Sequence, residues 1–237
     1  MTFDITIPVL NEEETLDRQV RFLHQFLCTH FPNRQDWKIV IADNGSTDAT
    51  PRIAEELGRE LPEVQLVRVP EKGVGLALKT SWAQSTADMV GYMDLDMATD
   101  LQHFLEAHRA IAEGYDVVYG TRLHARSKVI GRTITREITS RVFNFIVQTY
   151  LGVRFSDGMC GFKWLQRAHV PALREGGAVS NGWFFSTELL AIAEWKGLRL
   201  YELPVVWTDD AANSKVNIPR LAKQYLRAMA VLKQRKP

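Results

Sequence analysis

The sequence is poor in cysteine, carries almost no net charge and has no long uninterrupted run of apolar residues. Its two cysteines, Cys28 and Cys160, lack the paired cysteines or neighbouring histidines of a zinc site. Few cysteines and no N-terminal signal sequence are typical of cytosolic proteins. A transmembrane helix needs about 18 or more consecutive apolar residues, so we expect that the chain does not cross a membrane by itself.

The charge balance and the length also limit the kinds of partner and the number of domains that we expect. The net charge is only +1 and gives no overall attraction for nucleic acid, so we expect no nucleic-acid partner. A hydrophobic content of 46% and a charged content of 24% are ordinary for a soluble globular protein. A length of 237 residues suits one large domain or two small ones, and no segment resembles a linker.

Apolar runs and helical patterns alternate through the first half of the chain. Strands are predicted at 3–9, 37–42, 64–69, 88–93 and 115–119. Helices between the strands indicate βαβ units, and therefore an α/β fold with a mainly parallel central sheet flanked by helices. We expect Asn11 to cap the first helix and Asp100 to cap the helix that follows the fourth strand.

The pattern changes in the second half. The sequence predicts a helix over 133–151, a short strand over 161–165, a helix over 183–195 and a final strand over 198–206. This last strand could join the sheet in the antiparallel direction. We expect the main domain to cover residues 1–210.

The remaining segment, residues 211–237, has no acidic residue. Its seven basic residues are Lys215, Arg220, Lys223, Arg227, Lys233, Arg235 and Lys236. Apolar residues recur there at helical spacing, which predicts a basic amphipathic helix. Such a helix could pack on the domain with a solvated basic face, or it could lie on anionic lipid headgroups.

Two acidic residues follow the fourth predicted strand at Asp94-Leu95-Asp96. In an extended strand, residues two apart share a face, so both carboxylates can point at one object. Two neighbouring anions repel each other unless a cation lies between them. We expect Mg²⁺ or Mn²⁺ at Asp94 and Asp96, holding a phosphate, because hard oxygen ligands suit these ions. The alternative is a solvated loop.

Two other strands end in polar clusters, Asn11-Glu12 after the first strand and Asp43-Asn44-Gly45-Ser46 after the second. Ligands of open α/β sheets bind at the carboxyl ends of the strands, so these clusters and the acidic pair predict one site. Acids with a metal suit a nucleotide with phosphates, and Asp43 could accept hydrogen bonds from its base or ribose. The run Lys72-Gly73-Val74-Gly75 only partly matches a dinucleotide fingerprint, because Leu78 stands at the position of the third glycine.

Taken in order along the chain, these runs resemble the motifs of a known protein family. Ile7-Pro8-Val9-Leu10-Asn11-Glu12, Ala42-Asp43-Asn44-Gly45-Ser46-Thr47-Asp48, Lys72-Gly73-Val74-Gly75 and Asp94-Leu95-Asp96 resemble family 2 glycosyltransferases of the GT-A fold. The second half is similar to the polyprenyl-phosphate sugar synthases, which include dolichyl-phosphate mannose synthases and glucosyltransferases. The segments concerned are Gly120-Thr121-Arg122, Arg136-Glu137-Ile138-Thr139-Ser140-Arg141, Asn144, Leu151-Gly152, Asp157, Gly161-Phe162-Lys163, 183–190 and Glu202-Leu203-Pro204-Val205.

The resemblance implies an inverting, metal-dependent transfer of a hexose from a nucleotide sugar, such as UDP-glucose or GDP-mannose, to a polyprenyl phosphate. It implies an enzyme at the cytoplasmic membrane face, bound peripherally or through a membrane-protein partner. The residues that match donor-contact positions are Pro8, Leu10, Glu12, Ile41, Asp43, Asp94, Leu95, Asp96 and Lys215. The residues that match acceptor-phosphate positions are Arg122, Arg136 and Ser140. Asp94, Asp96, Arg122, Arg136 and Ser140 are thus the expected catalytic residues.

Simple chemistry is consistent with these roles. Guanidinium groups bind phosphate with paired hydrogen bonds, and Arg136 and Ser140 are four residues apart on one helix face. The alternative for this pair is a solvated helix surface. An acceptor phosphomonoester is mostly dianionic at neutral pH, because its second pKa is about 6, so it needs no general base.

The sequence also departs from the family pattern. Relatives commonly have aspartate at the position of Ser186 and tyrosine at that of Leu10. Mannose synthases have glutamine at Ala98 and arginine at Asp209, so the chain is closer to the glucosyl-type and bacterial branch. Two other functions stay open: transfer to a protein, polysaccharide or soluble acceptor, and donor binding without catalysis, which the loss of aspartate at Ser186 would allow.

Overall fold

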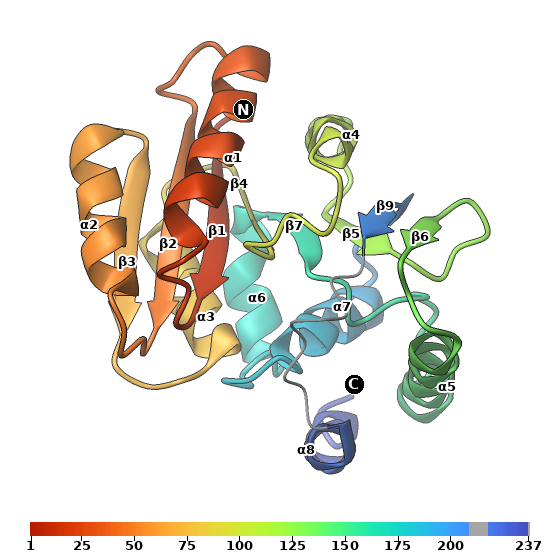
Figure 1. Cartoon of the computed structure of the whole chain (residues 1–237). Coiled ribbons are helices and arrows are strands. Elements are labelled where there is room, and N and C mark those ends of the chain that lie inside the picture. The colour runs from red at the N-terminus through yellow and green to blue at the C-terminus, as the bar shows by residue number, and fades with distance from the viewer. Residues whose placement is uncertain (209–217, 237) are drawn as a thin grey trace.

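The computed structural model describes residues 1–208 and 218–236. Its first half alternates strands and helices in the predicted order (Figure 1). The elements are β1 (Phe3–Val9), α1 (Leu16–His30), β2 (Trp37–Asn44), α2 (Thr50–Glu60), β3 (Val64–Val69), α3 (Val74–Gln84), β4 (Met89–Met93), α4 (Gln102–Ala112) and β5 (Val117–Thr121). The predicted strand and helix types are confirmed there, with boundaries shifted by one to a few residues.

The second half is less regular and contains a second, smaller sheet. Its elements are β6 (Lys128–Ile130), α5 (Ile134–Leu151), β7 (Phe162–Gln166), a 3₁₀ turn η1 (Arg167–His169), α6 (Val170–Glu175), α7 (Phe185–Trp195), β8 (Leu200–Pro204), β9 (Val206–Thr208) and α8 (Ile218–Lys233). Strands β6 and β9 pair with each other in parallel. Figure 1 shows α5 and α8 at the end of the molecule opposite α1 and α2.

The main sheet has seven strands in the order β3-β2-β1-β4-β7-β5-β8. All of its neighbouring pairs are parallel except the two that involve β7, which is antiparallel to both β4 and β5. The expectation that the last strand joins antiparallel is therefore wrong. The chain runs down β7 and returns through α6 and α7, so β8 starts beside the start of β5, with Leu200 opposite Val117.

The two predicted helix caps have different outcomes. Asp100 precedes α4, and its Oδ1 accepts a hydrogen bond from the backbone N–H of Gln102 at 2.9 Å, as a capping side chain does. Asn11 does not cap α1, because that helix begins only at Leu16. Instead, Asn11 has the left-handed φ of 56° and its side chain accepts a hydrogen bond from the Thr47 N–H at 2.8 Å.

The two faces of the main sheet carry separate apolar clusters. One includes Phe3, Ile5 and Phe104 under α1 and α4, and the other includes Trp82 and Leu190 under α3 and α7. Tyr225, Met229 and Leu232 attach α8 to the second cluster, so the predicted amphipathic helix packs its apolar face on the domain. In the part of the chain that the structure describes, no helix combines the length and apolarity needed to cross a bilayer.

The centre of β4 requires a glycine. Gly91 lies opposite Trp164 of β7, and a Cβ on Gly91 would lie 2.2 Å from the Trp164 ring and 2.5 Å from the Lys163 carbonyl oxygen. No rearrangement of a flexible side-chain end can relieve both contacts. The glycine thus allows β7 and its large indole to pack against β4.

We predict that Gly91→Ala destabilises the protein by about 3 kcal/mol or more, at the upper end of overpacking effects, because backbone and indole must both move. Urea unfolding followed by tryptophan fluorescence measures this change. Gly182→Ala is the matched control, since a Cβ there meets nothing within 4 Å. Equal unfolding midpoints for the two variants would contradict the prediction.

Candidate functional site

Three parallel strands end side by side in the polar loops that the sequence analysis singled out. Val9 of β1 pairs with Asp43 of β2, and β4 lies on the other side of β1. Asn44 joins the loops, because its side-chain Nδ2 donates to the Val9 carbonyl at 2.6 Å and its Oδ1 accepts from the Gly73 N–H at 3.2 Å. The predicted convergence of the three strand ends is confirmed by the strand order, and Asn44 connects the end of β1 with the loop before α3.

Asp43 is fully buried at the end of β2. Its Oδ1 accepts a hydrogen bond from the Ser46 N–H at 3.0 Å, and its Oδ2 lies 3.4 Å from Nε of Arg68. Arg68 stands opposite Asp43 in the parallel register of β2 and β3, which only the structure reveals. The carboxylate is therefore held in a fixed orientation at the edge of the site.

The other predicted donor-contact residues lie at different depths. Pro8, Leu10 and Glu12 are half-buried at the end of β1 and in the loop after it. The carboxylate of Glu12 accepts a hydrogen bond from the Thr15 hydroxyl at 2.7 Å. Ile41 is fully buried within the apolar core beneath the site, and Lys215 lies outside the described residues.

Asp94 and Asp96 follow β4 and differ in their surroundings. The carboxyl group of Asp94 packs against Gly161, where a Cβ would lie only 2.0 Å from Oδ2. Burial, and then the negative charge of Asp96, raise the pKa of Asp94 to about 7, although Arg122 and Lys163 oppose the shift. Asp96 is exposed, and its Oδ1 accepts a hydrogen bond from the Ala98 N–H at 3.0 Å.

These two carboxylates fit a divalent cation that takes its other ligands from a substrate. Oδ1 of Asp94 is buried and has no hydrogen-bond partner within residues 1–208 and 218–236. Among these same residues, no group of three or more acidic, histidine or cysteine side chains could hold a metal. Mg²⁺ is commonly bound through one or two carboxylates together with substrate phosphates, which matches this donor set. Leu95 points away into the core and is buried.

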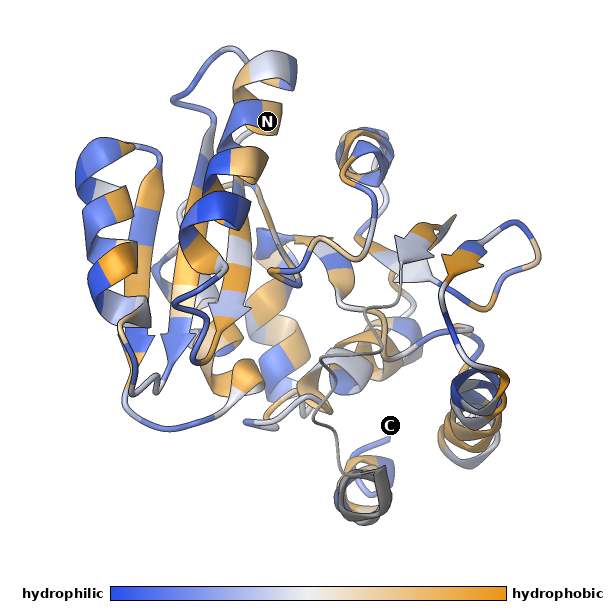
Figure 2. Ribbon diagram, in the orientation of Figure 1, coloured by the Kyte–Doolittle hydropathy of each residue, from blue (hydrophilic) through white to orange (hydrophobic). Residues whose placement is uncertain are grey.

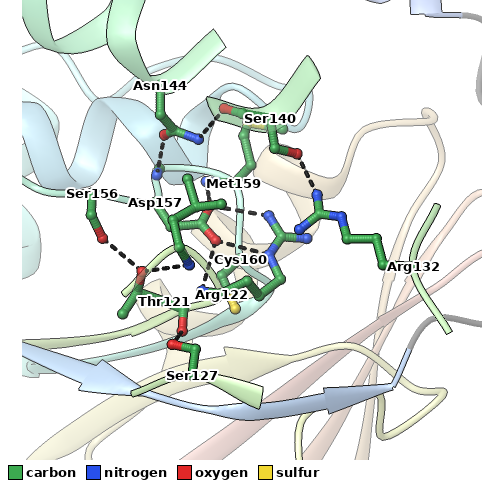
Figure 3. A network of polar contacts seen from close by, with 12 residues as sticks. Thr121, Arg122, Ser127, Arg132, Ser140, Asn144, Ser156, Asp157, Met159 and Cys160 are labelled. Carbon is green, nitrogen blue, oxygen red and sulfur yellow. Dashed lines mark hydrogen bonds and ion pairs between the residues drawn. The ribbon is translucent and has the colours of Figure 1, made fainter. Parts of the chain in front are cut away.

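A buried ion pair lies next to the acidic loop (Figure 3). Arg122 donates from Nε and Nη2 to the two carboxylate oxygens of Asp157, at 2.8 and 3.0 Å, and its backbone N–H also donates to Asp157. Burial alone would raise the pKa of Asp157, but the Arg122 charge and hydrogen bonds lower it to about 2. The guanidinium fork that was predicted to bind a phosphate is thus occupied by Asp157.

Lys163 is a second cation in the same buried region, and only 1% of its surface is exposed. Its Nζ donates to the carbonyl oxygens of Gly158 and Cys160, at 3.2 and 2.6 Å. Burial lowers the pKa of Lys163 to about 8, while the nearby acidic groups oppose the shift. In the sequence, Lys163 and Asp157 stood out only as parts of motifs, and the partner of Asp157, Arg122, lies 35 residues away.

The backbone of Gly158 is held from two sides. Its carbonyl oxygen accepts hydrogen bonds from Lys163 and from the hydroxyls of Ser186 and Thr187, while its N–H donates to Oδ1 of Asn144 at 2.9 Å. Helices α5 and α7 thereby fix the segment that carries Asp157. The hydroxyl of Tyr92 donates to Ser186 at 2.7 Å, so Ser186 is a buried structural link.

The remaining predicted residues, Arg136 and Ser140, belong to helix α5. Arg136 and Ser140 are one helical turn apart, and both are half-buried. Ser140 Oγ accepts a hydrogen bond from Nη2 of Arg132, a residue that the sequence analysis did not consider (Figure 3). The guanidinium carbons of Arg122 and Arg132 lie 5.2 and 5.7 Å from the ring centroid of Trp207.

We predict that Ser186→Ala lowers the free energy of unfolding by about 1–3 kcal/mol, because the buried Tyr92 hydroxyl loses its acceptor. Tyr92→Phe removes that hydroxyl, so the double variant should be more stable than the sum of the two single effects implies. Urea unfolding of all four proteins gives the coupling energy. Strictly additive effects would contradict the role of Ser186 as the partner of Tyr92.

Comparison with known proteins identifies the family. The family model described as glycosyl transferase family 2 matches residues 4–173. Glycosyltransferase AglD of Haloferax volcanii is 31% identical over 218 residues, which is 91% of this chain but 34% of that protein. A dolichyl-phosphate beta-glucosyltransferase of Trichomonas vaginalis is 27% identical and is matched over 92% of this chain and 66% of its own length. The chain therefore spans about a third to two thirds of these relatives.

Solved structures share the fold. The UDP complex of glucosyl-3-phosphoglycerate synthase from Mycobacterium tuberculosis superposes with a TM-score of 0.67 at 20% identity, covering 98% of this chain and 80% of that one. Its complex with Mn²⁺, UDP and glucosyl-3-phosphoglycerate has a TM-score of 0.66, also at 20% identity, over 99% and 80% of the two chains. The chain thus belongs to glycosyl transferase family 2, and it has the GT-A fold.

Proposed function

We propose that the protein transfers a hexose, with inversion, from a nucleotide sugar to a polyprenyl phosphate at the cytoplasmic face of a membrane. One observation carries this proposal. The acidic pair lies beside the buried Arg122, and Ser140 of α5 accepts a hydrogen bond from Arg132, which shares the Trp207 ring with that arginine. The names of the dolichyl-phosphate beta-glucosyltransferases among the relatives support the same substrate class.

On the donor side, the chain offers one group for the nucleoside and two for the diphosphate. Asp43 is oriented to accept hydrogen bonds from a ribose or base, as acids are in other nucleotide-binding folds. Asp94 and Asp96 would hold Mg²⁺ or Mn²⁺ together with the diphosphate, and Mn²⁺ accompanies UDP in a related structure. When bound, such an ion stabilises the negative charge of the departing nucleoside diphosphate.

On the acceptor side, the phosphate itself is the nucleophile. One of its oxygens forms a bond to the anomeric carbon, and the bond from that carbon to the diphosphate breaks, with its electron pair leaving on the diphosphate. The acceptor is already mostly dianionic, because its second pKa is about 6, so no general base is required. Ser186 accordingly serves as a structural link, since its hydroxyl donates to the Gly158 carbonyl.

Helix α5 is rich in hydrophobic residues (Figure 2), and several of them are exposed, which supports contact with a membrane. Ile134, Ile138, Val142 and Phe145 are 79%, 56%, 53% and 66% exposed, although each has a large apolar side chain. The same helix carries Arg136 and Ser140, so it would present a lipid-facing surface next to the acceptor phosphate. Residues 211–237 would add a basic surface for anionic headgroups or for a membrane-protein partner.

The direct test is transfer of radiolabelled hexose into a butanol-extractable lipid, with a panel of UDP- and GDP-hexoses and a polyprenyl phosphate. Label in the lipid phase supports the proposal and identifies the donor. Label in a soluble product would favour a protein, polysaccharide or soluble acceptor instead. No product with any donor would favour a donor-binding protein without catalytic activity and would refute the proposed reaction.

Asp96→Asn is predicted to lower metal-dependent turnover roughly 100-fold or more, because loss of a ligand removes several kcal/mol of charge stabilisation. Turnover is measured against Mn²⁺ concentration. Asp100→Asn is the matched control, since Asp100 caps α4 and is predicted to have no contact with the donor. Full activity of Asp96→Asn would remove Asp96 from the metal site.

Phe145→Ser is predicted to weaken sedimentation of the protein with liposomes that contain anionic lipid, because it removes a 66% exposed aromatic side chain from the apolar face of α5. A several-fold lower bound fraction is the expected result. Phe22→Ser is the control, since Phe22 is 55% exposed but lies on α1. If both substitutions reduce binding equally, α5 is not the membrane-facing element.

A further inference from the structure

Arg132 precedes the N-terminal cap of α5 and is held by three separate contacts. Its Nη2 donates to Ser140 Oγ, its Nη1 lies 3.3 Å from Oε2 of Glu137, and its guanidinium carbon lies 5.7 Å from the Trp207 ring centroid. Only 8% of its side-chain surface is exposed. A buried guanidinium that is oriented in this way is suited to bind an anion.

Trp207 lies between the two substrate sides of the site. It belongs to β9, whose neighbouring residue Thr208 donates from its N–H to the Ala98 carbonyl at 2.8 Å, in the loop after the acidic pair. Val206, on the other side, accepts from the Asp100 N–H at 3.1 Å. The ring also lies within cation–π distance of Arg122. Trp207 is therefore fixed by the donor loop while it supports arginines on the acceptor side.

We propose that Arg132 is a binding residue for the acceptor phosphate, and that Trp207 is its positioning residue. This inference rests on the proposed function. Arg122 directs its guanidinium fork at Asp157, so a dianionic acceptor needs another guanidinium close by. Arg132 contacts Ser140, which matches an acceptor-phosphate position, and it therefore lies where that phosphate is expected.

The hydrogen-bond chemistry of this pair suits a phosphate. Ser140 accepts a hydrogen bond from Arg132 through its oxygen, so its own hydroxyl hydrogen can be donated to a phosphate oxygen. A guanidinium has five N–H donors in one plane, an arrangement that matches the oxygens of a phosphate.

An internal anion already occupies one position on Arg132. Glu137 lies 3.3 Å from Nη1 of Arg132 and 2.6 Å from Nε of Arg141, so one carboxylate is shared between two arginines. The shorter contact is the one to Arg141, which is 58% exposed. An incoming phosphate dianion could replace Glu137 on Arg132, while Arg141 would keep Glu137 as its partner.

The test compares kinetic constants for the two substrates. We expect Arg132→Met to raise the KM for polyprenyl phosphate about 10- to 100-fold, the range for losing a hydrogen-bonded charge, and to leave the KM for the donor within about twofold. Trp207→Leu should also raise the KM for polyprenyl phosphate, and Trp207→Phe should raise it less. Arg126→Met is the control, because it removes the same charge from an exposed loop position.

A binding measurement makes the test independent of turnover and of folding defects. The thermal shift produced by a short-chain isoprenyl monophosphate, compared with its parent alcohol, should be lost in Arg132→Met and in the charge-retaining Arg132→Lys, but kept in Arg126→Met. A normal acceptor KM or phosphate-dependent shift in the Arg132 variants would overturn this inference alone. Failure of the wild-type protein to glycosylate polyprenyl phosphate would refute the proposed function instead.

Discussion

The geometry of the site depends on the buried ion pair between Arg122 and Asp157. Three hydrogen bonds join these residues, and the Asp157 carboxylate has no exposed surface. Removing one partner of a buried pair costs about 3–5 kcal/mol, since the other charge stays buried and unpaired. The pair fixes the end of β5 against the segment before β7, and so holds the acceptor side of the site beside the acidic loop after β4.

The antiparallel direction of β7 explains how this segment reaches the site. The other interior strands of the sheet deliver their carboxyl ends to the site, whereas β7 begins there, with Phe162 opposite Met93 at the end of β4. Residues that precede β7 therefore meet residues that follow β4 and β5. Two basic side chains, Arg122 and Lys163, lie close to the acidic side chains Asp94 and Asp157 in the buried region that results.

Periodicity and turn residues were sufficient to predict the parallel half of the fold and the convergence of its strand ends. They did not determine the direction of β8, because a short alternating strand has the same pattern in either direction. Asn11 precedes three glutamates and resembles a helix cap, yet its left-handed backbone conformation directs it to another loop. The Arg122 fork was predicted to bind phosphate from the resemblance and from guanidinium chemistry. Its partner Asp157 could not be recognised, because the two residues are 35 positions apart in the sequence. Arg132 could be recognised as a candidate site residue only from its contacts with Ser140 and Trp207.

The link from Tyr92 through Ser186 to Gly158 affects which sequences this site can tolerate. An aspartate in place of Ser186 could still accept the Tyr92 hydrogen bond, but it would add a third acidic group to a buried region that already holds Asp94 and Asp157. Relatives with aspartate there would need an additional proton or a further cation nearby. The residue at this position and the number of buried cations around it should therefore co-vary across the family. We expect the uncharged serine where no additional cation is buried nearby.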